Sequence, residues 1–490
     1  MQLNNNTLKK MQQNPAEYPN LDLPQYDRES TEIGIVHIGL GAFHRSHQAY
    51  YVEKVLNEYG GNWGICGVTM RNRELAEALN SQDGLYSIAK MDIENSYQIV
   101  GALKEVLVAQ DDLAKVLARL VAPTTKMVSI TVTEKGYCLN ADGQLDLSND
   151  LIKHDLENLA APKSSVGMLV ASLAERKEQG IAPFTVVACD NLPANGKKLK
   201  QAVIQLAKYS SAELADWIED SVDFPSTMVD SITPKSDDSA IKLINEQFGL
   251  DDNAPVQRES FTQWVIEDSV SGEIPALDKV GVIFSDNVAG FEHTKLRILN
   301  GLHSTLAYIG RLAQHNYVFD AMEDVKLTRF LYRLVDQEII PSIDAPLGLN
   351  LTEYSRQIIS RFENPKVRYH LEQIACDGSI KIPVRTFEPI FDNLQSGRLV
   401  SDLYTVVAGW IRFIRLKHIN QDQLNDPRAD ELLSVVSEFT DEADRDVALF
   451  LSVPNLVPDY LAGNSALIAG VTKAYSAFLS AGDQPQLALA

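Results

Sequence analysis

The pattern that most constrains this chain is an alternation of short apolar runs with amphipathic helical stretches, which stops near residue 288. Runs of this length suit buried strands, and the segments between them carry helical periodicity. We expect strands at 35–38, 64–69, 127–132, 185–188 and 280–284, and helices at 47–57, 73–79, 111–120 and 166–178. Strands that alternate with helices predict a parallel sheet covered on both faces, the α/β class.

Beyond residue 288 strand patterns become scarce, and long helical patterns take their place at 292–313, 324–339, 351–362, 402–415, 429–437 and 441–452. A chain of 490 residues is too long for one ordinary domain. We therefore expect an α/β domain at 1–287 and a mostly α-helical domain at 288–490. Residues 1–31 are polar and predict an arm over the surface, and the turn-rich stretch 237–255 predicts an excursion within the first domain.

Composition limits the partners of this chain. The formal charge is −22, which argues against a general nucleic-acid or anionic-membrane surface. Four widely separated cysteines without a CxxC pair indicate free thiols rather than disulfides or zinc ligands. The first residues carry no basic stretch before an apolar run, and no segment approaches the roughly eighteen apolar residues of a membrane span. We expect a cytoplasmic protein, as a monomer or small homo-oligomer.

A glycine-rich turn follows the first expected strand, in the sequence Ile35-Val-His-Ile-Gly-Leu-Gly-Ala-Phe-His44. Gly39 permits a tight turn, and Gly41 lets a pyrophosphate approach the backbone at a helix N-terminus. His44 replaces the third glycine of the dinucleotide fingerprint. Its place at the first strand–helix turn favours dinucleotide binding by Ile38, Gly39, Leu40, Gly41, Ala42 and Phe43, against the alternative of a purely structural turn.

The second expected strand ends in Thr69-Met-Arg-Asn-Arg-Glu74, where a dinucleotide-binding fold reads the adenosine ribose. A carboxylate such as Glu74 favours the free 2′-hydroxyl of NAD. Arginines such as Arg71 and Arg73 favour the 2′-phosphate of NADP. Both cofactors therefore remain open on local grounds, and a solvated helix start is the structural alternative.

Polar residues also follow three other apolar runs. Asn191 and Asp230 are candidates to orient a substrate, because ligands of α/β folds bind at the carboxyl ends of strands. Thr131 and Glu134 end another strand, where Glu134 is placed to relay protons. Helix caps, turns and surface ion pairs are the structural alternatives for these positions.

The stretch Lys295-Leu-Arg-Ile-Leu-Asn-Gly-Leu-His303 carries the clearest proton-transfer chemistry. At about 100° per helical residue, Lys295, Asn300 and His303 share one broad face. Such a face suits an alcohol: one group takes the proton and two donors hold the oxygen as it becomes a carbonyl. A solvated helix with scattered polar residues is the alternative.

Other chemistries find less support. Tyr-x-x-x-Lys pairs occur at Tyr50/Lys54 and Tyr86/Lys90, but neither lies on a catalytic helix far downstream of the glycine turn. Cys and His residues do not show the spacing of zinc ligands, so we expect no metal. In the helical half, Lys381 and Arg385 lie four residues apart and suit an anion or a row of hydroxyls. A helix end with basic residues is the alternative there.

Together these motifs resemble the mannitol dehydrogenase family of polyol-specific long-chain dehydrogenases. The resemblance rests on five motifs in order: 39–48, 131–137, 189–193, 228–230 and 295–303. It implies a Rossmann-type domain at 1–287, a helical domain at 288–490 and a cleft between them that holds nicotinamide and substrate. It also implies a metal-independent oxidation of a secondary alcohol to a ketone, with NAD as the usual cofactor.

The resemblance assigns roles to residues that match the motifs. Lys295 becomes the general acid/base, which must be neutral in the oxidative direction, and Asn300 and His303 polarise the carbonyl. Asn191 and Asp230 position the substrate, and Lys381 contacts its far end.

The far end of the substrate divides the family into branches. Gln373 and Arg385 are similar to the branch that interconverts mannonate and fructuronate, and Arg385 is placed to pair with a carboxylate. The N-terminal arm and the segment 426–429 are more similar to enzymes that interconvert mannitol and fructose. We favour the sugar acid, with mannitol as the alternative.

Two positions depart from the family pattern. Ser231 stands where an Arg is usual, and Arg73 lies near a place where mannitol enzymes show acidic residues. A more remote alternative is a catalytically silent nucleotide-binding sensor. It is disfavoured because Lys295, Asn300 and His303 are all present.

Overall fold

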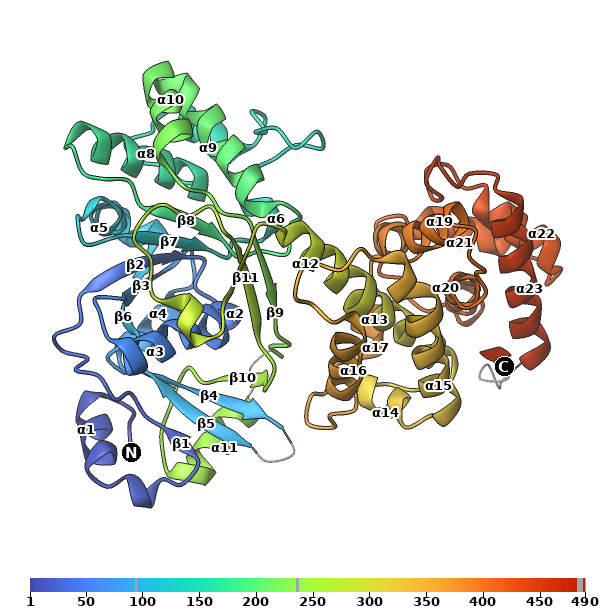
Figure 1. Ribbon diagram of the computed structural model, residues 1–490, viewed down its shortest axis with the longest axis horizontal. Helices are drawn as coiled ribbons and strands as arrows, with labels where there is room; N and C mark the ends of the chain where they lie inside the picture. Colours follow the sequence, from blue (N-terminus) through green and yellow to red (C-terminus); the bar gives the residue numbers. More distant parts are fainter. Residues whose placement is uncertain (93–94, 235–237, 483–487, 490) are drawn as a thin grey trace. The chain divides into compact units, whose positions relative to one another are not determined.

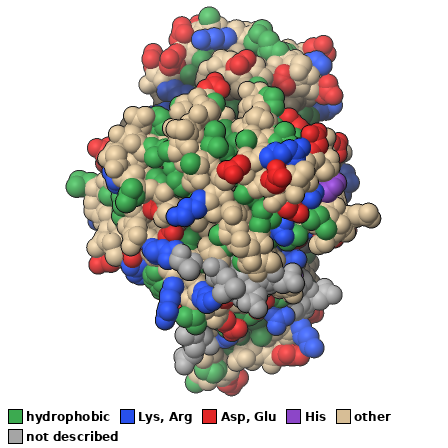
Figure 2. Space-filling view, turned by 90° about the vertical axis from the view of Figure 1, so that its right-hand side faces the viewer, with side chains coloured by type: hydrophobic (Ala, Val, Ile, Leu, Met, Phe, Trp, Pro, Cys, Tyr) green, Lys and Arg blue, Asp and Glu red, His purple; other side chains and the backbone are tan. Residues whose placement is uncertain are grey.

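The computed structural model describes residues 1–92, 95–234, 238–482 and 488–489, with only the backbone described at 238–240. The chain forms two compact units, Met1–Ala289 and Gly290–Ala490. Among the described residues, no helix is both long and apolar enough to cross a membrane. On the face drawn in Figure 2, acidic, basic and apolar side chains are interspersed rather than gathered into single-sign patches.

A five-stranded parallel sheet organises the first unit (Figure 1). Its strands run in the order β6 (Leu103–Val108), β3 (Gly64–Thr69), β2 (Ile33–Ile38), β7 (Met127–Ile130) and β8 (Thr185–Ala188). From β2 the chain continues to β3 and β6 on one side of β2, and then to β7 and β8 on the other side. The strand order therefore reverses between β2 and β7, which is where ligands of such sheets bind.

The sheet is buried on both faces, as the sequence predicts. Val36 and Ile38 pack on one side against the helices α5 (Ala109–Val121), α8 (Ser165–Glu178) and α9 (Asn195–Ser210). Ile35, one residue along, packs on the other side with α3 (Gln48–Tyr59) and α4 (Arg73–Asn80). This alternation follows from the two-residue repeat of a strand. The remaining elements beside this core are α2 (Ala42–Ser46), α6 (Thr133–Gly136), α7 (Asp150–Glu157) and α10 (Ala212–Ser221).

Two smaller sheets complete the first unit, and most of their strands are not among those expected from the sequence. One sheet has the order β1 (Leu21–Asp22), β5 (Ser96–Val100), β4 (Tyr86–Met91) and β10 (Val256–Glu259). The other has the order β12 (Ile283–Ser285), β11 (Gln263–Glu267) and β9 (Thr227–Asp230). The strand expected at 280–284 is displaced, because a 3₁₀ turn at Leu277–Val280 precedes β12.

Two segments outside the parallel sheet share one apolar cluster. Residues 1–31, expected as an arm over the surface, contain α1 (Asn5–Gln13) and β1 and bury Leu3, Leu8 and Met11 in this cluster. The stretch 237–255, expected as an excursion within the first domain, contains α11 (Asp238–Phe248), which adds Ile244 and Phe248 to the same cluster. Residue 237 itself lies outside the described residues. Within α1, the buried apolar residues Leu8 and Met11 lie three positions apart, on one helical face.

The second unit is helical around one large apolar core. Its α-helices are α12 (Val288–Lys295), α13 (Gly301–Thr305), α14 (Val318–Met322), α15 (Val325–Leu334), α16 (Leu351–Phe362), α17 (Leu371–Ile374), α18 (Gly378–Ile382), α19 (Glu388–Gln395), α20 (Asp402–Asn420), α21 (Ala429–Ser437), α22 (Ala443–Leu451) and α23 (Ser465–Ala481). Among the described residues of this unit, four π-helical turns join some of these helices, at Leu296–Asn300 (η3), Leu306–Gly310 (η4), Val335–Ile339 (η5) and Pro383–Phe387 (η7).

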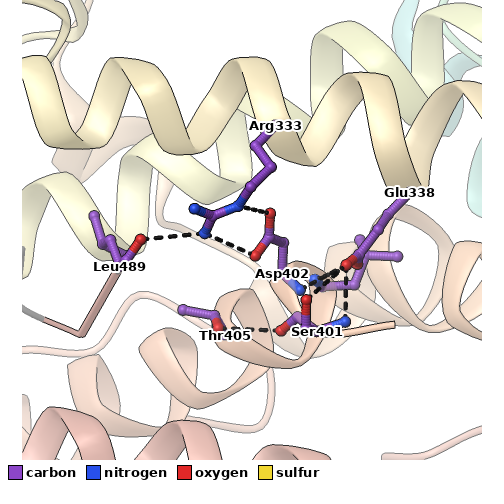
Figure 3. Close-up of polar contacts among 7 residues, drawn as sticks. Arg333, Glu338, Ser401, Asp402, Thr405 and Leu489 are labelled. Carbon is purple, nitrogen blue, oxygen red and sulfur yellow. Dashed lines mark hydrogen bonds and ion pairs between the residues drawn. The ribbon is translucent and has the colours of Figure 1, made fainter. Parts of the chain in front are cut away.

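The buried helix α20 begins at a carboxylate from one of these π turns. Glu338 of η5 accepts the backbone N–H groups of Ser401, Asp402 and Leu403, each at 2.8 Å (Figure 3). Arg333 donates to both carboxylate oxygens of Asp402, at 2.7 and 3.0 Å. Glu338 thereby satisfies donors that the first turn of a helix leaves without partners. A buried charge thus joins a π turn to the central helix.

Candidate active site

The glycine turn after β2 leaves no space for a side chain at its first glycine. Gly39 has φ +98°, and a Cβ there would lie 2.1 Å from the carbonyl oxygen of Thr131. At Gly41 a Cβ would meet only the Gly39 carbonyl oxygen, at 3.7 Å. The protein therefore leaves the space over Gly41 open, beside the first residues of α2. This is the cradle that a bound dinucleotide phosphate needs, so the turn fits a dinucleotide.

Two stacked imidazoles support this turn from inside. The rings of His37 and His44 lie 3.4 Å apart between centroids and 12° from parallel. Thr131 Oγ1 donates to the Gly39 carbonyl oxygen at 3.0 Å, so His37 Nε2, 2.9 Å from the same hydroxyl, is its donor. Burial lowers the pKa of His37 to about 3 and that of His44 well below its usual range. His44, in place of the third glycine, therefore packs as a neutral ring.

The residues expected to read the ribose follow β3, next to this turn. Arg71, Arg73 and Glu74 are all exposed at the start of α4. Arg73 pairs with both oxygens of Asp111, at 2.5 and 2.6 Å, which raises the pKa of its guanidinium. Arg73 thus has an acidic partner within the protein, whereas Arg71 is exposed just before α4.

The ends of β7 and β8 meet through a carboxylate that sequence reasoning passed over. Asp190 accepts the backbone N–H groups of Val132 and Thr133, at 3.2 and 2.9 Å, and the hydroxyl of Tyr137 at 3.1 Å. Burial raises its pKa. Asp190 therefore fixes the loop between Thr131 and the exposed Glu134, and it leaves Asn191 exposed beside it. A carboxylate directly after a buried strand was the available signal.

Asp230 lies apart from these residues in the sheet arrangement. It ends β9 in a different sheet, where it pairs in register with Gln263 and is 3% exposed. The neighbouring Ser231 donates its hydroxyl to the Phe261 carbonyl at 3.0 Å. The first unit thus brings together the candidates that follow β2, β3, β7 and β8 at one edge of the parallel sheet.

In the second unit, Lys295, Asn300 and His303 lie on one continuous helix, but its geometry differs from the expected α-helix. The π turn η3 spans Leu296–Asn300, between Lys295 and His303. Hydrogen bonds from residue i to i+5 place residues five apart on successive turns. Lys295 and Asn300 are five residues apart, so they lie closer to one line along the helix in a π turn than they would in a regular α-helix. Such turns are rare and are often found at functional sites.

Aromatic side chains surround the histidine of this group. His303 is 7% exposed, and its ring stacks on Phe362 of α16 at 4.4 Å. Tyr369 meets the same ring edge-on at 5.5 Å. These contacts fix the plane of the imidazole, as a hydrogen-bond donor to a substrate oxygen requires.

Lys381 and Arg385 lie beside that helix on the segment formed by α18 and η7. Arg385 Nη1 donates to the Ser304 hydroxyl at 3.0 Å and to the Asn300 carbonyl at 3.3 Å. Lys381 Nζ donates to the Cys376 carbonyl at 2.6 Å. Burial, and then the charge of Arg385, lowers the pKa of Lys381. Gln373 of α17 is exposed. Arg385 therefore contacts the segment that carries Asn300 and His303.

The pairs that suggested other chemistries have structural roles. The Tyr86 hydroxyl is buried and donates to the Arg45 carbonyl at 2.7 Å, so it is not available to a substrate. Lys54 donates to the Val280 carbonyl at 2.9 Å. The four cysteines are free thiols. Within the part of the chain that the structure describes, no three His, Cys, Asp or Glu side chains form a group that could hold a metal ion.

Comparisons with known proteins agree with this arrangement. Residues 33–279 match the mannitol dehydrogenase Rossmann domain, and residues 287–479 match the mannitol dehydrogenase C-terminal domain. The chain is 41% identical over 460 residues to the D-mannonate oxidoreductase of Escherichia coli, covering 92% of this chain and 94% of that protein. It is 35% identical over 464 residues to the mannitol 2-dehydrogenase of Pyricularia oryzae, covering 92% of each.

Solved structures give the same result. A D-sorbitol dehydrogenase in substrate-free form matches all of both chains with a TM-score of 0.91 at 31% identity. A Pseudomonas fluorescens mannitol 2-dehydrogenase, solved as a ternary complex with NAD and D-mannitol, matches 99% of both chains with a TM-score of 0.82 at 32% identity. The family and the fold class predicted from the sequence are therefore confirmed: this chain belongs to the mannitol dehydrogenase family and is an oxidoreductase.

Proposed function

We propose that this protein is an NAD-dependent dehydrogenase of a sugar acid, interconverting D-mannonate and D-fructuronate. The 41% identity to a D-mannonate oxidoreductase supports this substrate. In this proposal residues 1–287 form the cofactor domain and residues 288–490 the substrate and catalytic domain.

The observation that carries the sugar-acid proposal is the environment of Arg385. Among the described residues, no carboxylate lies within ion-pair distance of its guanidinium, and its hydrogen bonds use Nη1 alone. Burial lowers its pKa, and only the phenols of Tyr308 and Tyr369 oppose that effect. A largely buried arginine usually has an acidic partner. In a protein of charge −22, a buried arginine that has no acidic partner among the described residues suits a carboxylate carried by the substrate.

The proposed reaction divides the chemistry among this chain's residues. Lys295, in its neutral form, takes the proton of the substrate hydroxyl. Asn300 and His303 donate hydrogen bonds to the oxygen as it becomes a carbonyl. Asn191 and Asp230 orient the substrate, and Gln373, Lys381 and Arg385 meet its far end. NAD, when bound, supplies the hydride acceptor.

The cofactor assignment rests on the turn around Gly39 and on the residues after β3. Ile38, Leu40, Ala42 and Phe43 flank the two glycines in the sequence, Thr131 directly follows β7 and Glu134 lies in α6. Glu74 is exposed and supports recognition of a free 2′-hydroxyl, while Arg73 is already paired with Asp111. Arg71 leaves NADP as a second possible cofactor, and we expect NAD to be preferred.

The second candidate function is the interconversion of mannitol and fructose. The identity to mannitol 2-dehydrogenases and the structural similarity to one of them favour it. In that case Arg385 would act only through Asn300 and Ser304, and its removal would affect acidic and neutral substrates alike.

A steady-state panel of D-mannonate, D-mannitol, D-altronate and D-arabinitol, each with NAD and with NADP, tests the proposal directly. We then expect Arg385→Met to lower kcat/KM for D-fructuronate about 10- to 100-fold more than that for D-fructose, the cost of losing a charge-assisted hydrogen bond. Ser304→Ala is the matched control, because it removes a contact of Arg385 and keeps the charge. Equal losses on both substrates in Arg385→Met, or a wild-type preference for mannitol, would contradict the sugar-acid proposal.

A further inference from the structure

The four π turns of the second unit share a feature that the proposed catalytic roles do not explain. Each turn contains a buried or half-buried polar side chain that bonds to a different element. Tyr308 of η4 donates to the Ala375 carbonyl, Glu338 of η5 accepts the first amides of α20, and Arg385 of η7 donates to Asn300. In η3 that side chain is Arg297. A π turn has strained geometry, so it persists where the surrounding contacts hold it.

Arg297 makes contacts in two directions from the middle of η3. Its side chain is 3% exposed, and Nη2 lies 2.5 Å from Asp392 and 3.8 Å from Glu388, both on α19. Nη1 donates to the carbonyl of Ser342, which follows η5. The guanidinium therefore joins η3 to two other elements of the core. If the guanidinium moved away from Asp392 and Glu388, its charge would be buried without a partner, which costs free energy. The ion pairs therefore hold Arg297 in this position.

The position of Arg297 in the sequence links these contacts to the chemistry. It lies two residues after Lys295 and three before Asn300, inside the turn that spaces them. If η3 relaxed to ordinary i-to-i+4 bonding, Asn300 would rotate about the helix axis, away from Lys295. The rotation would be most of the roughly 100° that separates neighbouring residues of an α-helix. The alignment of a proton acceptor with an oxygen-holding amide would then be lost, even though the helix would remain.

We propose that Arg297 is a positioning residue: through Asp392, Glu388 and Ser342 it holds the π turn that aligns Lys295 with Asn300. This inference rests on the proposed function, because it takes Lys295 and Asn300 to act on the substrate hydroxyl. Arg297 does not itself touch the reacting atoms. Its effect is on the rate of the chemical step rather than on substrate or cofactor binding.

The test compares three variants with a matched control. Arg297→Met keeps much of the side-chain volume and removes the charge, Arg297→Lys keeps the charge, and Asp392→Asn weakens the nearest ion pair. The control, Arg445→Met, removes a half-exposed arginine that lies 3.7 Å from Asp446 in α22. We expect Arg297→Met to lower kcat about 10- to 100-fold with little change in KM, the cost of a misplacement near 1 Å. Arg297→Lys should recover part of that loss, and Arg445→Met should stay within about twofold of wild type.

Two further measurements separate positioning from stability alone. The primary deuterium isotope effect on kcat should rise in Arg297→Met, because hydride and proton transfer become slower relative to product release. Amide hydrogen exchange across residues 295–300 should become faster than in the control, and this readout needs no substrate.

The outcomes are distinguishable. If wild-type protein turns over no alcohol in the substrate panel, the proposed function fails, and hydrogen exchange alone decides whether Arg297 holds η3. If Arg297→Met does not fold, Arg297→Lys and Asp392→Asn decide the question. Unchanged kcat and unchanged exchange in folded variants would overturn the inference. A fall in kcat that matches a loss of folded protein, with an unchanged isotope effect, would also overturn it.

Discussion

At Gly39 the first unit has no space for a side chain, whereas the π turn η3 of the second unit depends on one. The glycine turn is set by the backbone of neighbouring strands: the Thr131 carbonyl would lie 2.1 Å from a Cβ at Gly39. The π turn is set by Arg297, whose partners on α19 lie some ninety residues away in the sequence. The difference is one of range, because the first constraint comes from an adjacent strand and the second from distant helices.

This contrast predicts how each region fails. Changes at the glycine turn should affect cofactor affinity. Changes along the helix of Lys295 should affect turnover while cofactor affinity is kept. The following predictions test that separation, beginning with the largest expected effect.

Replacement of the proposed base should separate the two properties most clearly. We expect Lys295→Ala to lower kcat about a thousandfold, since general acid–base catalysis contributes 10²- to 10⁴-fold. The dissociation constant for NAD, measured by fluorescence titration, should stay within about threefold of wild type because the glycine turn is unchanged.

Lys326→Ala, which removes an exposed lysine of α15, is the control for charge. A small primary amine added to Lys295→Ala should restore part of the rate, because it supplies a proton acceptor. Near-normal turnover in Lys295→Ala would remove Lys295 as the base. A large loss of NAD affinity would break the separation between the two regions.

Substitutions in the glycine turn should have the opposite signature. Gly39→Ala forces a Cβ against the Thr131 backbone, so we expect NAD affinity to fall about 30-fold or more and the melting temperature to fall as well. Gly41→Ala meets no such clash. It should lower NAD affinity by obstructing the phosphate while leaving the melting temperature near that of wild type.

Gly180→Ala controls for backbone strain alone, because Gly180 has φ +65° and nothing lies within 4 Å of its Cβ position. Cofactor affinity should be unchanged in this variant. If Gly39→Ala and Gly180→Ala behaved alike, the contact with Thr131 would have no role in the cofactor site.

The same contrast explains what could be predicted from the sequence. The parallel sheet and most of its helices follow from local periodicity, and β3 and β8 have the expected bounds. The face of Lys295, Asn300 and His303 was assigned to the correct helix, but a 100° repeat does not reveal a π turn. Arg297 and Asp190 were passed over because their partners come from distant segments. The strand β10 was not expected for a similar reason, since it pairs with β4 from a segment far away in the sequence.

The histidine pair under the glycine turn gives the prediction with the smallest effect. His37 is fully buried with a pKa of about 3, against about 6.5 in an unfolded chain. Above pH 6.5 the imidazole is neutral in both states. Between pH 6.5 and 3 the unfolded chain binds a proton that the folded protein does not. The free energy of unfolding therefore decreases as the pH is lowered through this range. The loss from His37 is about 2 kcal/mol at pH 5.

Another buried group acts in the opposite direction, so the measurement must be a difference between variants. Burial raises the pKa of Glu53 to about 7, and this group makes the folded protein more stable as the pH falls below 7. We therefore expect urea unfolding of wild type and His37→Asn to diverge between pH 7 and pH 5, with wild type losing about 2 kcal/mol more. Glu53 is present in both proteins and cancels from the comparison. Parallel pH profiles would show that His37 binds its proton as readily in the folded protein, and the neutral support under the glycine turn would then have to come from His44 alone.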